Sequence, residues 1–305
     1  MSLNMDRDDT ELRRTGVRRQ LSWLIRLLTP VWIALSIAAI AWQLSIHWDE
    51  IATQPIRWDL MIIAVLSTLC AKVFSALQVR RSLLQSGADV PAKATFYAYS
   101  LADLAKYLPG GIWGLVGRVA LYRRLQLSRS VIARAMIVEQ VWLVGGAVVT
   151  GCLFFSIADG GASAHSIAVI APILWGGLLH WTRRWATAPT GEPQALMSTI
   201  GIQAGLWFCA AVGFGILMPE VFIRAGSAFC LAFAAGLLAP FAPSGIGVRE
   251  AVVIALAGEV ALPDVLRALL LSRVVWIVAD AIFAAAVISL CKSAWAKAVE
   301  ASSAQ

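Results

Sequence analysis

Long apolar runs separated by short polar segments make up most of this chain. Each run is close to the 20 residues that an α-helix needs to cross a bilayer, and few carry more than one or two charges. Apolar runs of this length predict membrane-spanning helices rather than strands. Six crossings are predicted, at Leu27–Ile46, Leu60–Leu77, Gln140–Ile157, Ala164–Trp181, Ala195–Met218 and Ala268–Cys291.

The basic residues between these runs predict the orientation, because short cytoplasmic loops of membrane proteins are enriched in Lys and Arg. Nineteen of the 25 Lys and Arg fall on one predicted side, including a cluster of Arg before the first run. We therefore expect a multi-pass protein of the bacterial inner (cytoplasmic) membrane with both termini in the cytoplasm. Residues 1–26 form a basic cytoplasmic segment, 27–291 a single transmembrane domain, and 292–305 a cytoplasmic tail.

Two further apolar segments, residues 94–121 and 222–262, begin and end on the same side in this topology. The first is interrupted by Pro109-Gly110-Gly111 and the second by Pro243-Ser244-Gly245, where a continuous helix is costly. We expect each to be a broken re-entrant hairpin, the two entering from opposite sides. The predicted fold is an all-α polytopic membrane protein with about six transmembrane helices and two hairpins, arranged like the inverted repeats of secondary transporters.

Composition excludes several classes of protein. With 59% hydrophobic and 14% charged residues and a mean hydropathy of +0.76, the chain is too apolar for an ordinary soluble enzyme or a disordered protein. The five Cys form no CxxC pair and the three His no cluster, so no metal or other cofactor is expected. The net charge of +7 fits anionic lipid headgroups better than nucleic acid, given so many spans.

The hairpin breaks are the best candidates for a binding site. Each starts a new helix inside the membrane, whose unsatisfied N–H groups and positive dipole end favour an anion such as phosphate. Ionisable residues in membrane segments are functional candidates by default. The predicted phosphate-binding residues are Lys106, Pro109, Gly110, Gly111, Arg118, Ser244, Gly245, Gly247 and Arg249, with Ser244 as an N-cap.

Four more residues, Glu139, Glu250, Arg273 and Asp280, are predicted to balance these charges or to carry a proton. Asp103 lies three residues before Lys106, so the two can pair on one helix face. Ion pairs that only stabilise the fold are the alternative reading of these charged residues.

At the two breaks the sequence resembles the lysylphosphatidylglycerol synthase transmembrane region, a family of flippase-like integral membrane proteins. The segments that carry the resemblance are Lys106-Tyr-Leu-Pro-Gly-Gly-Ile-Trp-Gly and Pro243-Ser-Gly-Ile-Gly-Val-Arg-Glu250, and the order of segments agrees over roughly residues 20–292. The family is similar to the flippase half of the multiple peptide resistance factor, which moves aminoacylated phosphatidylglycerol across the inner membrane. Other relatives act around isoprenoid-linked sugars and hopanoids.

The resemblance implies a translocation unit, whereas a departure from the family's pattern argues against its enzyme activity. Bifunctional relatives carry a soluble aminoacyltransferase domain after the membrane part, whereas only 14 residues follow Cys291 here. We therefore expect a lipid flippase for a phosphate-bearing lipid, either a phospholipid or an isoprenoid-linked one. The alternative is a non-catalytic membrane partner or regulator of a lipid or polysaccharide biosynthesis enzyme, and a homo-oligomer is compatible with both. An intramembrane enzyme is disfavoured because no nucleophile–base set is visible.

Overall fold

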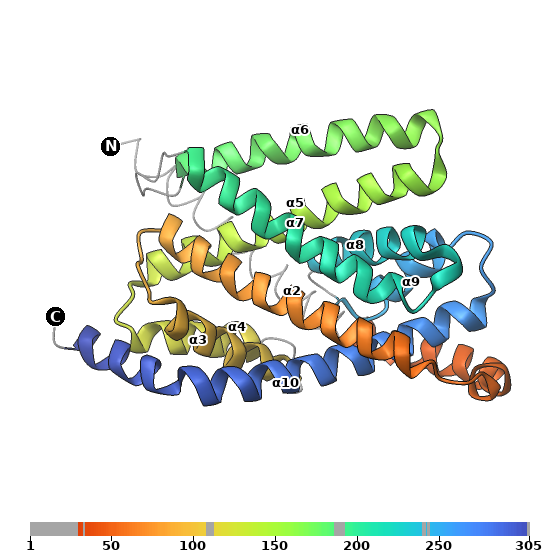
Figure 1. Cartoon of the computed structure of the whole chain (residues 1–305), viewed down its shortest axis with the longest axis horizontal. Coiled ribbons are helices and arrows are strands. Elements are labelled where there is room, and N and C mark those ends of the chain that lie inside the picture. Colours follow the sequence, from red (N-terminus) through yellow and green to blue (C-terminus); the bar gives the residue numbers. More distant parts are fainter. Residues whose placement is uncertain are drawn as a thin grey trace, which may run out of the picture.

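A computed structural model describes residues 30–32, 34–107, 113–185, 193–239, 242 and 245–303. Within these ranges the chain folds into helices and contains no strand, and the long helices run along one common direction (Figure 1). The helices are a first helix Pro30–Thr53, α2 Trp58–Gln85, α3 Ala92–Leu104, α4 Trp113–Arg124, α5 Arg129–Asp159, α6 Ala162–Trp185, α7 Pro193–Gly215, α8 Phe222–Leu238, α9 Val248–Leu256 and α10 Leu262–Ser303. Two short 3-10 turns, η1 Ala105–Tyr107 and η2 Pro219–Val221, precede α4 and α8.

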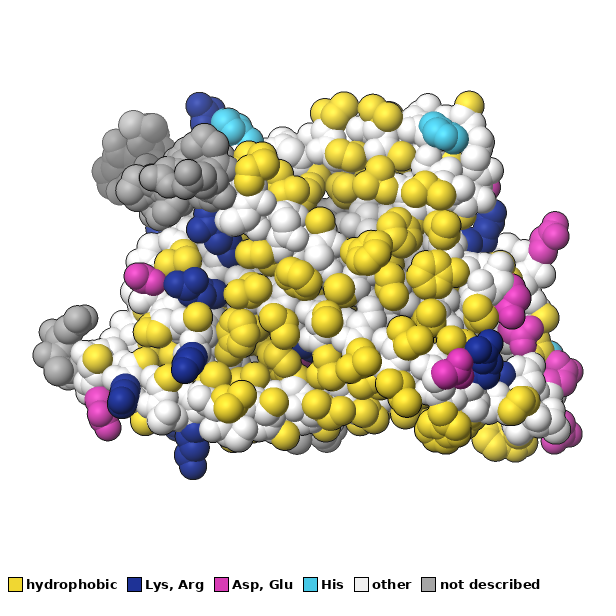
Figure 2. Space-filling view, viewed as in Figure 1, with side chains coloured by type: hydrophobic (Ala, Val, Ile, Leu, Met, Phe, Trp, Pro, Cys, Tyr) yellow, Lys and Arg dark blue, Asp and Glu magenta, His cyan; other side chains and the backbone are white. Residues whose placement is uncertain are grey.

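Seven of the described helices are long and apolar enough to cross a membrane. Six coincide with the predicted crossings, and the seventh, Pro219–Leu238, is the first arm of the second predicted hairpin. The chain is therefore an all-α polytopic membrane protein. Figure 2 shows apolar side chains spread across the middle of the molecule, with most Lys and Arg near the end where the C-terminus lies and most Asp and Glu near the other. Which end faces the cytoplasm stays a prediction.

The predicted tail continues the last helix. The sequence predicts a span that stops at Cys291, whereas α10 runs on to Ser303. Its added turns have apolar partners, because Trp295 is buried and stacks on Tyr97 of α3 with 5.5 Å between the ring centroids. The predicted basic segment, residues 1–26, lies outside the described residues.

Each of the two segments predicted as hairpins contains a pair of helices packed together, and their re-entry into the membrane stays a prediction. α3 packs against α4, and α8 packs against α9. Each first arm also packs against the long helix that follows the other hairpin: α3 contacts α10, and α8 contacts α5. α2 and α7, which precede the two hairpins, pack against each other. This reciprocal exchange of partners is the arrangement that an inverted repeat produces.

Small residues allow this packing. The buried face of α8 consists of Ala, Gly, Ser and Cys. Close backbone approach replaces the hydrophobic effect as the driving force between helices in lipid, because the lipid chains are as apolar as the side chains. Ser227 of α8 also donates a hydrogen bond of 2.8 Å to the carbonyl oxygen of Gly151 on α5. The first arm of the second hairpin is thereby held against the centre of the bundle.

Candidate functional site: a charged cavity between the hairpins

A cavity of about 540 Å³ lies between the two hairpins. Its walls come from α2, α3, η1, α4 and α5 on one side and from α7, α8, α9 and α10 on the other. Eight of its lining residues carry a formal charge: Lys72, Asp103, Lys106, Arg118, Glu139, Arg249, Glu250 and Arg273. Charges in membrane segments are costly unless they are paired, so their partners decide what the cavity can bind.

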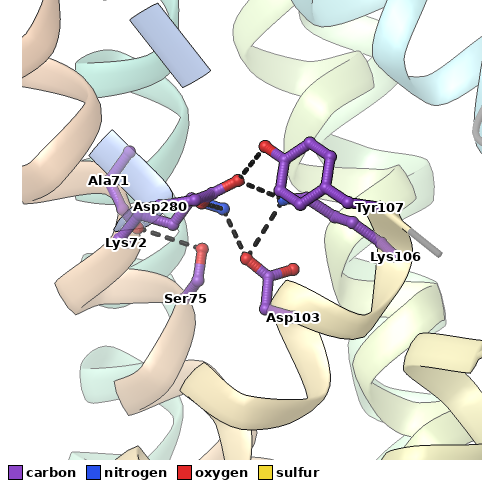
Figure 3. Close-up of polar contacts among 7 residues, drawn as sticks. All are labelled: Ala71, Lys72, Ser75, Asp103, Lys106, Tyr107 and Asp280. Atoms are coloured by element: carbon purple, nitrogen blue, oxygen red, sulfur yellow. Dashed lines mark hydrogen bonds and ion pairs between the residues drawn. The ribbon is translucent and has the colours of Figure 1, made fainter. Parts of the chain in front are cut away.

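Two lysines and two aspartates form a closed ring of ion pairs at one end of this cavity (Figure 3). The Lys72 Nζ lies 2.7 Å from Asp103 Oδ2 and 2.5 Å from Asp280 Oδ1. The Lys106 Nζ lies 3.1 Å from Asp103 Oδ2 and 2.7 Å from Asp280 Oδ2. The predicted pairing of Asp103 with Lys106 is thus confirmed. The ring is formally neutral and ties the first hairpin to α2 and α10.

Aromatic groups complete the ring. The Tyr107 hydroxyl donates a hydrogen bond of 2.5 Å to Asp280 Oδ2. The Lys72 Nζ lies 4.6 Å from the centre of the Trp276 ring, within the range of a cation–π interaction. The side chains of Lys72 and Asp280 are only 3% and 2% exposed, so these contacts take the place of water around both charges.

Each hairpin's second arm is joined to the long helix that follows it by an ion pair. In the first half, the guanidinium of Arg118 on α4 lies 2.6 Å from both carboxylate oxygens of Glu139 on α5. In the second half, Glu250 on α9 pairs with Arg273 on α10. The two pairs occupy corresponding places in the repeat with the signs of charge reversed, and each pair is neutral.

The surroundings of Arg249 differ from those of the other cations that line the cavity. Among the described residues no carboxylate pairs with it, and its Nε is buried without a hydrogen-bond partner. Its guanidinium lies 4.1 Å from the centre of the Phe233 ring. The side chain also fills the space above Gly236 and Gly245: a Cβ on Gly245 would lie 2.7 Å from its Nε. Of the described residues that line the cavity, Arg249 therefore carries the excess positive charge.

The structure brings most of the predicted site residues to this one cavity. Lys106, Arg118, Arg249, Glu139, Glu250 and Arg273 line it, and Asp280 completes the ring. Gly245 packs beneath Arg249, and the Gly247 N–H donates a hydrogen bond of 2.8 Å to Glu250 Oε2. Pro109, Gly110, Gly111 and Ser244 lie outside the described residues. The binding and charge-balancing roles of all these residues stay predictions.

The predicted N-cap at Ser244 is wrong, because α9 begins later. Its N-cap is Gly247, and the helix starts at Val248. The reason is the backbone before it: Gly245 and Gly247 have φ values of +72° and +83°, a left-handed conformation that delays the helix.

Lys72 and Tyr107 are the site residues that sequence reasoning underrated. Lys72 is the only charge in the second predicted span, and that isolation was the available signal. Tyr107 has a common residue type at a helix end, and nothing in the sequence indicates that its hydroxyl meets Asp280.

Gly245→Ala is expected to lower the free energy of unfolding by about 1–2 kcal/mol, because an L-residue is strained at this left-handed φ. The added Cβ would also lie 2.9 Å from the Cα of Gly236, where the backbone cannot move aside easily. Thermal unfolding in detergent measures the change. Gly201→Ala on α7 is the control, since its Cβ would meet nothing within 4 Å. Equal melting temperatures for the two variants would contradict the expectation.

The sequence was compared with protein-family models and with curated proteins, and neither comparison gives a match.

Proposed function

We propose that this protein moves a phosphate-bearing lipid between the two leaflets of its membrane and holds the lipid's phosphate in the central cavity. The observation that carries this proposal is Arg249, which has no carboxylate partner among the described residues, in a cavity whose other described charges are balanced. The hairpin residues outside the described ranges, 108–112, 240, 241, 243 and 244, include no ionisable side chain that would change this balance. One excess positive charge matches the single negative charge of a phosphodiester.

The chemistry of the guanidinium supports the same ligand. Arg binds phosphate through charge-assisted hydrogen bonds that are roughly twice as strong as neutral ones. The Arg249 guanidinium has no carboxylate partner among the described residues, and a phosphate would supply the missing negative charge. The resemblance at the hairpin breaks to flippase-like membrane proteins points to the same class of substrate.

The paired charges suit passage of a headgroup rather than permanent binding. Ion pairs that join the hairpins to α2, α5 and α10 line the cavity with polar groups, so a headgroup entering it exchanges water for polar contacts. The lipid chains remain in apolar surroundings throughout. This division is what a lipid flippase requires.

Movement of fluorescent lipids in vesicles tests the proposal. The full chain is reconstituted into vesicles of digalactosyl diacylglycerol, a bilayer-forming lipid without phosphate, that contain traces of phosphatidylglycerol or of a monogalactosyl diacylglycerol, each with the same chain-attached fluorophore. A reductant that cannot cross the membrane then bleaches the outer leaflet. We expect the protein to make inner-leaflet phosphatidylglycerol accessible to bleaching, and to move the phosphate-free lipid far more slowly.

Two results would contradict the proposal. Equal rates for the two lipids would show that the phosphate is not recognised. Movement of neither lipid, together with recovery of a biosynthetic enzyme in stoichiometric amount by affinity purification, would favour the alternative role as a membrane partner of that enzyme.

A further inference from the structure

A second hollow of about 610 Å³ lies between α5, α6 and the C-terminal end of α8. Its walls are almost entirely apolar, with valines of α5 facing Ile170 and Leu174 of α6 and Leu238 of α8. Gln140 is the one amide side chain among its lining residues. Ile170, Leu174 and Leu238 are each more than half exposed, so the hollow is a groove open at the surface of the bundle.

The groove exists because α6 packs mainly against α5. Among the described helices, α6 packs extensively against α5 and not against α8, and Figure 1 shows it at the edge of the bundle. The attachment is tight: a Cβ on Gly145 of α5 would lie 1.9 Å from Cδ1 of Trp175 on α6. Trp142 of α5 also donates a hydrogen bond of 3.3 Å to Thr182. α6 is thus fixed in a position that leaves space between it and α8.

The groove begins where the charged cavity ends. Gln140 and Leu237 line both spaces. Gln140 directly follows Glu139, the partner of Arg118, and its side chain is exposed. A polar carboxamide therefore stands at the boundary between a space lined by charges and a space lined by hydrocarbon. A lipid has the same order of groups: a charged headgroup, polar ester linkages and apolar chains.

We propose that this groove holds one hydrocarbon chain of the lipid whose phosphate occupies the central cavity, with Gln140 beside the ester linkage. The proposal rests on the proposed function for the identity of the headgroup. A groove of this kind gains little affinity from the chain alone, because lipid chains are as apolar as the residues that line it. Its occupancy by one lipid therefore depends on the phosphate, and in return the seated chain positions that phosphate beside α4 and α9.

Photochemical labelling of the full chain in vesicles of phosphate-free digalactosyl diacylglycerol tests the groove without measuring transport. The probe is a phosphatidylglycerol with a diazirine in the middle of one acyl chain, and the comparison probe is a diacylglycerol with the same chain. We expect the phosphatidylglycerol to label groove-lining Ile170 and Leu174 about tenfold more than the diacylglycerol does, because only it binds the charged cavity. Both probes should label Ile173 equally, since Ile173 is exposed on α6 and does not line the groove.

Matched variants sharpen the test. Ile170→Trp fills the groove from α6, and Val148→Phe fills it from α5. Both should abolish the excess labelling of Leu174 by phosphatidylglycerol, whereas Ile173→Trp should retain it. Measuring two filling variants guards against a failure of either one to fold.

Equal labelling of the groove by the two probes would overturn the proposal, even if the protein moves lipid in the vesicle assay. Selective labelling that the filling variants abolish would support it, even if no lipid moves. The groove and the proposed function can therefore fail separately.

Discussion

Arg249→Ala is expected to abolish the selective movement of phosphatidylglycerol while leaving the helix bundle folded. A hydrogen bond to a charged group contributes about 1.5–3 kcal/mol, so loss of this contact corresponds to a loss of about 10-fold to 100-fold in affinity for the headgroup. Folding should be little affected, because no described carboxylate would be left without its counter-charge. Bleaching rates and thermal unfolding of the same preparation measure the two effects.

Two companion variants make this result specific. Arg249→Lys retains the charge but not the planar guanidinium, so an intermediate rate is expected. Arg224→Ala removes an arginine that lies away from the cavity lining, 3.6 Å from Asp159, and should leave the rate unchanged. An Arg249→Ala protein that moves phosphatidylglycerol at the wild-type rate would show that the excess charge does not hold the headgroup.

Asp280→Ala is expected to cause the largest loss of stability, about 3–5 kcal/mol, because it leaves buried charges uncompensated. Lys72 and Lys106 would then share only Asp103, and Lys72 is 3% exposed. The double variant Lys72→Met with Asp280→Leu removes one charge of each sign and should regain most of the lost stability. Chemical unfolding in detergent, followed by tryptophan fluorescence, measures both variants.

Asp264→Ala is the matched control on the same helix. Asp264 is exposed near the start of α10 and accepts a hydrogen bond of 2.9 Å from Gln54, so its loss should change stability by no more than about 0.5 kcal/mol. If Lys72→Met with Asp280→Leu were as unstable as Asp280→Ala, the loss of free energy of unfolding would come from lost packing around α10. The ring of ion pairs would then not be what stabilises this region.

The architecture was predictable from the sequence because it depends on local properties. The lengths of the apolar runs predict the spans. The Pro and Gly residues predict where the two hairpins are interrupted, because the cost of continuing a helix through such a residue depends on the residue itself. The end of α10 was missed for a related reason. Residues 292–303 are polar enough to suggest a tail, and only the tertiary contact of Trp295 with Tyr97 shows why they continue the helix.

The pairing of charges could be predicted only where it is local. Asp103 and Lys106 share one helix end, so their spacing indicates their contact. Lys72 meets Asp280 across two helices that are distant in the sequence, which depends on how the bundle packs. Lys106, Arg118 and Arg249 therefore look equivalent in the sequence, as cations near hairpin breaks. The structure shows that the first two are paired, whereas the third has no carboxylate partner in the described part of the chain.

The ion pairs of α10 have a mechanical consequence. This one helix carries Asp280, bound to the first hairpin, and Arg273, bound to the second. The two residues are two turns apart, a separation of about 10 Å along the axis. A large displacement of α10 relative to either hairpin would therefore have to break one of these ion pairs. One helix thus links the two hairpins through ion pairs on its own side chains.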